Sequence, residues 1–75
     1  MPQLSGLVMH VGTNLSYGTR REVEQNVMHH EGVASAYFNE SRPQFMVIEY
    51  DPQQINSFEI MKEVHSNALQ AARIG

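Results

Sequence analysis

A chain of 75 residues that contains no cysteine has few ways to become stable. Its length allows one hydrophobic core, and a chain this short buries only about 60% of its unfolded surface on folding. Disulfides and cysteine-bound metals cannot add stability, so the apolar pattern must supply it. The same absence excludes thiolate catalysis, cysteine-rich zinc sites, iron–sulfur sites and a disulfide-stapled secreted scaffold. We therefore expect a single domain over residues 1–75.

The charged residues are few and scattered. The formal net charge is −3, and the five basic residues form no cluster that could follow a nucleic-acid backbone. The apolar runs are too short to span a membrane, and the first residues lack the basic and apolar regions of a signal peptide. We therefore expect a cytoplasmic protein with neither nucleic acid nor membrane as a partner.

The first half of the chain has the pattern of a strand followed by a helix. The apolar run over residues 4–11 is closed by turn-forming residues, which predicts a first strand. Ser16 or Thr19 can cap the helix that follows, in which Val23 and Val27 lie one turn apart.

The second half predicts a hairpin, a helix and a short last strand. Residues 33–39 alternate between apolar and polar side chains, and residues 45–50 are the most β-prone stretch of the chain. Polar turn residues separate these two strands, which predicts a hairpin. Asn56 or Ser57 caps a second helix, whose apolar residues recur at three- and four-residue spacing. Residues 69–74 are expected to form the last strand.

The expected order of elements is strand, helix, strand, strand, helix, strand, which is the pattern of a split βαβ unit. Right-handed crossovers return both helices to the same side of the sheet. The predicted fold class is therefore α+β, a ferredoxin-like βαββαβ sandwich in which two helices cover one face of a four-stranded antiparallel sheet. The residues expected in the core are Met9, Val11, Val23, Val27, Ala34, Ala36, Phe38, Met46, Ile48, Tyr50, Met61 and Val64.

The sequence also carries short motifs at the spacing of a known family. They are Glu31-Gly32-Val33, then Ala36, then Phe38-Asn39, and finally Val47-Ile48-Glu49-Tyr50-Asp51-Pro52. Through these motifs the chain resembles the heavy-metal-associated (HMA) domain family of copper chaperones and of the amino-terminal regions of heavy-metal-transporting ATPases. The resemblance extends over about residues 7–71 and implies the ferredoxin-like fold.

The metal loop of that family is replaced in this sequence. The resemblance places the two positions of its Cys-x-x-Cys at Ser16 and Thr19 of Ser16-Tyr17-Gly18-Thr19. Copper(I) selects cysteine and methionine sulfur, and neutral hydroxyl groups leave its charge uncompensated. The resemblance therefore implies the fold and not the metal site. A second departure lies near the end of the chain, where Ala68-Leu69 stands in place of a glycine and an aromatic residue.

The degenerate metal loop has two interpretations. Free N–H groups at the start of a helix can hold a carboxylate or phosphate, with Ser16, Thr19 and the backbone of Gly18 as donors. The simpler interpretation is a capped helix followed by two solvated arginines, Arg20 and Arg21.

Histidine and methionine remain as candidate metal ligands. His10, His29, His30 and His65 are spread along the chain, and no pair has the i, i+4 spacing of a helical metal site. The expected topology places His10 and His65 at one end of the domain and the other two histidines at the opposite end. Binding of zinc, copper or haem through His10 with Met9 or His65 is therefore the alternative hypothesis for function.

Catalytic groups are not recognisable in the sequence. It contains no nucleophile with a matching base, no phosphate loop and no close carboxylate pair. Glu22 and Glu24 are expected on a solvated helix face, and Glu49 is a lone carboxylate on the uncovered side of the sheet. We therefore expect a protein that is not an enzyme.

The uncovered face of the predicted sheet is the main candidate site. If Phe38 and Met46 point toward the helices, their strand neighbours must point away from them. The candidate interaction residues on that face are Val8, His10, Tyr37, Phe45 and Val47. Clustered exposed aromatic and β-branched residues mark a contact surface, so we expect binding of another protein or self-association through this face.

Overall fold

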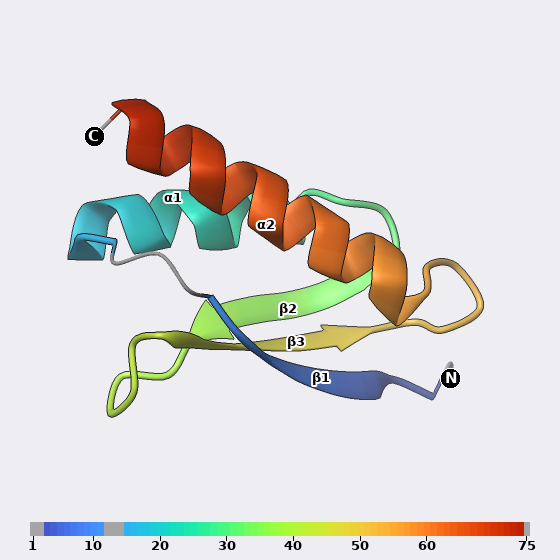
Figure 1. Ribbon diagram of the computed structural model, residues 1–75. Coiled ribbons are helices and arrows are strands. Elements are labelled where there is room, and N and C mark those ends of the chain that lie inside the picture. Colours follow the sequence, from blue (N-terminus) through green and yellow to red (C-terminus); the bar gives the residue numbers. More distant parts are fainter. Residues whose placement is uncertain (1–2, 12–14, 75) are drawn as a thin grey trace.

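The computed structural model describes residues 3–11 and 15–74, with side chains described up to residue 70. The elements are β1 (Ser5–His10), α1 (Tyr17–Met28), β2 (Val33–Phe38), β3 (Phe45–Tyr50) and α2 (Ser57–Ile74). They form two layers, with both helices on one face of the sheet (Figure 1). The α+β class and the one-sided helix layer are as predicted, while the turn expected at residues 12–14 lies outside the described residues.

The sheet has the strand order β1-β3-β2, and both pairings are antiparallel. The predicted hairpin between β2 and β3 is therefore confirmed. An irregularity between Val33 and Ser35 shifts the register at the start of β2. As a result Ala34 is exposed, and its prediction as a core residue was wrong. A bulge of this kind leaves the extra residue out of the alternation between the two faces.

The predicted fourth strand over residues 69–74 is also wrong, because this segment continues α2 to Ile74. The segment is rich in alanine and other strong helix formers, with no glycine or proline to end the helix after Asn67. Asn67 itself fits inside the helix, since its Nδ2 donates to the carbonyl oxygen of Glu63 at 2.8 Å. The described sheet therefore has three strands rather than four.

The core lies between the sheet and the helices, and α2 faces it differently from the prediction. Ile60, Val64 and Ala68 are buried at four-residue spacing. Met61 was expected in the core, but its side chain is 37% exposed. The complete set of buried apolar residues is Met9, Val11, Leu15, Val23, Val27, Ala36, Phe38, Met46, Ile48, Tyr50, Ile55, Ile60, Val64 and Ala68.

A turn after β3 fixes the start of α2. The backbone N–H of Asp51 donates to the carbonyl oxygen of Gly32 at 2.8 Å, which joins the two loops at this end of the sheet. The Asp51 carboxylate accepts bonds from the backbone N–H of Gln53 at 3.0 Å and from Gln54 Nε2 at 2.9 Å. Asn56 then caps α2, because its Oδ1 accepts from the backbone N–H of Glu59 at 2.8 Å.

Candidate functional site

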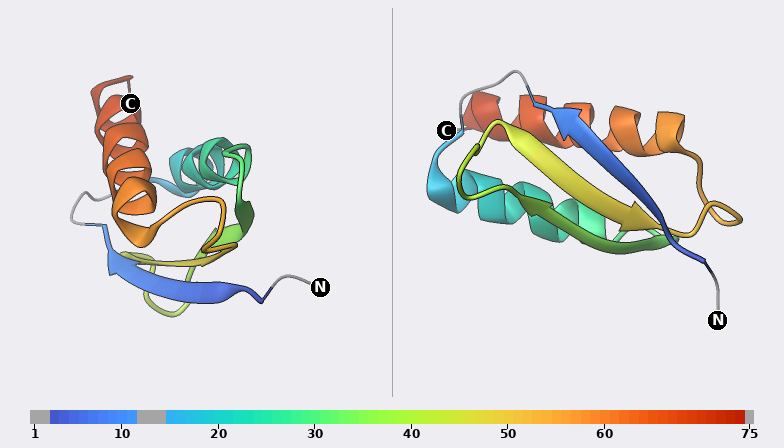
Figure 2. Two further views of the ribbon diagram at one scale, coloured as in Figure 1. Left: turned by 90° about the vertical axis from the view of Figure 1, so that its right-hand side faces the viewer. Right: turned by 90° about the horizontal axis from the view of Figure 1, so that it is seen from below.

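The uncovered face of the sheet carries an apolar row that crosses all three strands. Val47 on β3 pairs with Val8 on β1 and with Tyr37 on β2, so the three side chains stand side by side. Val8 is 64% exposed and Tyr37 is 49% exposed. In the view from below in Figure 2, this face of the sheet lies in front of both helices.

A second row lies beside the first. His10 pairs with Phe45, and their rings meet edge to face with centroids 5.1 Å apart and planes at 67°. We call the two rows together, Val8, His10, Tyr37, Phe45 and Val47, the open-face patch. The structure therefore brings together all five residues that were predicted for this surface.

The alternation of the strands determines which residues form the open-face patch. Met9, Met46 and Phe38 are buried beneath the helices, and their neighbours along each strand must face the other way. A polar row borders the patch on one side, where the hydroxyl of Ser35 donates to Glu49 Oε1 at 3.0 Å. Glu49 thus has a partner on this face and limits the length of the apolar surface.

The degenerate metal loop forms the capped start of α1. The Ser16 hydroxyl donates to Thr19 Oγ1 at 2.9 Å and accepts the backbone N–H of Thr19 at 3.3 Å. Arg20 Nη1 donates to the carbonyl oxygen of Leu15 at 2.6 Å, and its guanidinium carbon lies 5.9 Å from the centroid of the Tyr17 ring. These groups satisfy one another, which favours the capped-helix interpretation over an anion site.

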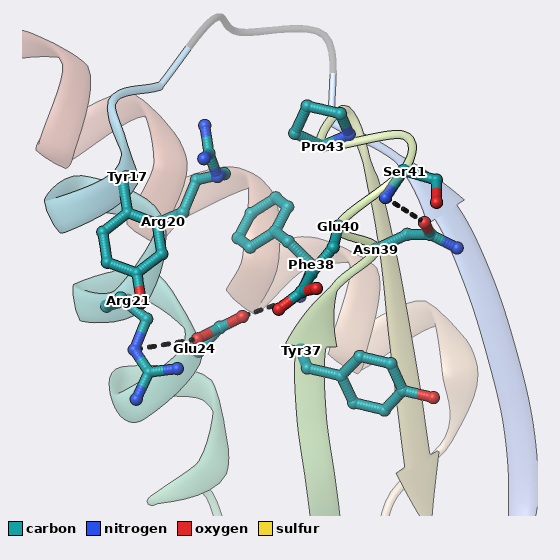
Figure 3. Close-up of a pocket in the computed structure, with 10 residues that line it drawn as sticks. All are labelled: Tyr17, Arg20, Arg21, Glu24, Tyr37, Phe38, Asn39, Glu40, Ser41 and Pro43. Atoms are coloured by element: carbon teal, nitrogen blue, oxygen red, sulfur yellow. Dashed lines mark hydrogen bonds and ion pairs between the residues drawn. The ribbon is translucent and has the colours of Figure 1, made fainter.

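A hollow of about 600 Å³ lies between the start of α1, the end of β2 and the loop before β3 (Figure 3). Tyr17 of the degenerate loop and Tyr37 of the open-face patch both line it. Glu24 lies between them and accepts a 2.7 Å hydrogen bond from the backbone N–H of Phe38, with Arg21 Nε 3.8 Å from its other oxygen. The prediction of Glu24 as a solvated residue was wrong, because it is buried.

The candidate metal ligands are separated in the structure. Met9 lies in the core on the helix side of β1, whereas His10 is exposed on the opposite face, so the pair cannot bind one ion together. His65 is exposed on α2. His30 is engaged at the end of α1, with Nδ1 3.0 Å from the carbonyl oxygen of Glu31 and Nε2 4.0 Å from Glu63 Oε1. Within residues 3–11 and 15–74, no three histidine, aspartate or glutamate side chains group as a metal site would require.

In the part of the chain that the structure describes, neither helix has the length and hydropathy needed to cross a bilayer.

The sequence matches no protein-family model and no curated protein, but its fold matches solved structures. The amino-terminal soluble domains of Bacillus subtilis CopA align over 88% of this chain with a TM-score of 0.76 and 16% identity. The amino-terminal extension of Cupriavidus metallidurans CzcP aligns over 93% with a TM-score of 0.76 and 18% identity. A copper form of a single-residue variant of Bacillus subtilis CopA aligns over 89% with a TM-score of 0.72 and 16% identity. The chain has an HMA-like fold.

This HMA-like chain spans 44% and 54% of the first two solved chains, about half of their length, and 87% of the third. At such low identity the likeness concerns the fold alone. This likeness confirms the resemblance predicted from the motifs that end in Tyr50-Asp51-Pro52. The chain has this fold although its sequence contains no cysteine.

Proposed function

We propose that this chain is a non-enzymatic interaction module that keeps the HMA-like scaffold without its cysteine metal site. It binds another protein, or a second copy of itself, through the open-face patch. The observation that supports this proposal is the continuous row of Val8, Val47 and Tyr37 across all three strands. The row lies on a sheet face that no described element covers (Figure 2).

The chemistry of the open-face patch suits a protein partner. Its two rows contain no Lys, Arg, Asp or Glu, and loss of charge together with aromatic side chains characterises the centre of protein interfaces. Tyr37 offers a ring with a polar tip, which can bury apolar area and still bond its hydroxyl. Ser35 and Glu49 provide a polar border on one side.

Metal binding is not part of this proposal. One of the solved CopA structures contains copper. In this chain the degenerate metal loop has the neutral hydroxyls of Ser16 and Thr19 at the two cysteine positions, and they bond to each other. Such groups are poor ligands for a soft cation. Titration of the chain with zinc, copper and haem should detect no binding tighter than about 10 μM.

The interaction test compares two double variants. Tyr37→Ser with Phe45→Ser removes the aromatic part of the open-face patch. Tyr17→Ser with Met28→Ser removes two exposed apolar side chains from α1 and serves as the matched control. The immobilised wild type and control should retain a protein partner from extracts of the source cells. The patch variant should lose this behaviour while its circular dichroism spectrum stays unchanged. Identical behaviour of all three proteins would refute the proposal.

A further inference from the structure

The outer edge of β1 carries unpaired backbone groups. The backbone N–H of Val11 donates to the carbonyl oxygen of Gln44 at 2.7 Å, which marks a hydrogen-bonded pair just beyond β1. Such pairs alternate along an antiparallel ladder, so the N–H and C=O groups of Gly6, Val8 and His10 point away from β3. No second strand receives them within residues 3–11 and 15–74.

The two edges of the sheet are treated differently. On the other edge strand, β2, the outward N–H of Phe38 is bonded to the Glu24 carboxylate of α1. The β1 edge has none of the usual protection, because Ser5–His10 contains no charged residue and no proline, and its pairing with β3 shows no bulge. Unprotected edges of this kind are templates for pairing with another strand.

An exposed apolar stripe on α2 lies on the same side of the molecule. Ile60, Val64 and Ala68 face the sheet, and Glu63 faces His30, in the turn that follows α1. At 3.6 residues per turn, Met61 and Leu69 fall on the flank away from α1, with the exposed His65 between them. Phe58 instead borders a hollow that it shares with His30 and Glu63. Met61 is 37% exposed and Leu69 is 58% exposed. Figure 2 shows α2 over the β1 side of the sheet and α1 over the β2 side, so this stripe and the β1 edge face the same way.

We propose that a second copy of this chain covers this side, with β1 pairing antiparallel to β1 of the partner copy across a two-fold axis at Val8. In that register Val8 opposes Val8 and Gly6 opposes His10, so all three outward residues of each strand find hydrogen-bonding partners. Gly6 has no side chain, and a Cβ there would meet nothing within 4 Å, which leaves room for the His10 ring. The strand is therefore complementary to itself.

The two-fold operation also explains the stripe on α2. In a continuous antiparallel sheet the axis stands perpendicular to the sheet, so the helices of both copies lie on the same face and the two α2 flanks turn toward each other. Met61, Leu69 and the strand edge of each copy then bury a small area, below the ~800 Å² per partner of a standard interface. Two chains that each carry a net charge of −3 repel each other. The β1 edge contains no Lys, Arg, Asp or Glu, so contact through it brings no like charges of the two edges together.

The dimer goes beyond the proposed function because it uses a different surface. It leaves the open-face patch free and doubles it, since the row of Tyr37, Val47 and Val8 continues into the same row of the second copy. Failure of one proposal is therefore separable from failure of the other.

Sedimentation of the 75-residue chain tests the dimer. The wild type should sediment with about twice the monomer mass of 8.5 kDa. Gly6→Pro removes an outward N–H and places a ring on the edge, and Met61→Lys with Leu69→Lys puts charge into the stripe. Each variant should weaken dimerisation at least about tenfold with an unchanged circular dichroism spectrum. The open-face variant Tyr37→Ser with Phe45→Ser should remain a dimer. A monomeric wild type, or dimers unaffected by both edge and stripe variants, would overturn the proposal.

Spin labels test the register, because the chain has no cysteine of its own. Spin labels attached to Val8→Cys in the two copies should lie next to each other, because the two backbones at this position are about 5 Å apart in the proposed dimer. Labels on Ala34→Cys, at the outer strand of each sheet, should be on backbones about 30 Å apart, because five strand spacings across the sheet add to an offset of about 16 Å along the strands. Equal distances for the two labels would contradict the edge dimer.

Discussion

The carboxylate of Glu24 accepts a 2.7 Å hydrogen bond from the backbone N–H of Phe38. Phe38 lies on an edge strand, and the 2.9 Å bond from the N–H of Asn39 to the carbonyl oxygen of Phe45 shows that the N–H of Phe38 points outward. One side chain of α1 thus closes part of the β2 edge and joins the helix to the sheet. Arg21 Nε lies 3.8 Å from the other carboxylate oxygen (Figure 3).

Removing this acceptor should destabilise the fold. Glu24→Ala leaves the buried N–H of Phe38 without a partner, which costs about 1–3 kcal/mol of unfolding free energy. Glu24→Gln retains a carbonyl acceptor and should cost less. Glu22→Ala, at an exposed position of the same helix, is the control. Urea unfolding measures all three, and equal losses for Glu24→Ala and Glu22→Ala would show that the bond contributes nothing.

Two glycines should respond to alanine with opposite signs. Gly32 has φ of +93°, and a Cβ there would lie 3.0 Å from both Gln54 Cβ and Ile55 Cγ2. Gly32→Ala should therefore cost about 1–3 kcal/mol of unfolding free energy. Gly18 lies in the first turn of α1, where a Cβ would meet nothing within 4 Å, so Gly18→Ala should stabilise by up to about 1 kcal/mol. Thermal unfolding of the two variants measures both signs, and a stable Gly32→Ala would contradict the loop geometry.

The stability of the turn after β3 should depend on acid pH. Hydrogen bonds from the Gln54 side chain and the Gln53 backbone lower the pKa of Asp51 from its ordinary value of 3.8. The charged carboxylate therefore stabilises the fold fully above that ordinary pKa, and this contribution is lost as the pH falls through the lowered pKa. Asp51→Asn should be less stable than the wild type near neutral pH, and the difference in Tm should shrink below about pH 4. A constant difference down to about pH 2 would contradict this.

Much of the fold could be predicted from the sequence because its local signals agree with one another. Alternation over residues 45–50 correctly assigned Met46 and Ile48 to the core and Phe45 and Val47 to the open face. The same alternation, applied to all three strands, is sufficient to place the five residues of the open-face patch on one surface. The motifs around Gly32 and Asp51 correctly indicated the HMA-like fold, since those residues meet at one end of the sheet.

The errors arose where position depends on tertiary contacts. The spacing that linked Met61 to the apolar face of α2 is shared by several rotations of the helix, and burial of Ile60 and Ala68 selected another one. Glu24 was assigned to a solvated helix face because a sequence does not show that an outward N–H of β2 lies opposite it. The bulge before Ser35 likewise leaves no recognisable sequence signal.

The rotation of α2 gives the last prediction, which rests on two neighbouring residues. Ile60 is 1% exposed and packs between the helices and the sheet, whereas Met61 is 37% exposed on the flank away from α1. Ile60→Ala removes buried methyl groups and leaves a cavity, so it should cost about 2–5 kcal/mol of unfolding free energy. Met61→Ala should cost less than about 1 kcal/mol, as expected for a partly exposed position. Urea unfolding at low protein concentration, where the chain is monomeric, isolates these effects from association. A larger loss for Met61→Ala than for Ile60→Ala would mean that α2 is rotated from the position described, and the apolar stripe would then belong to the core.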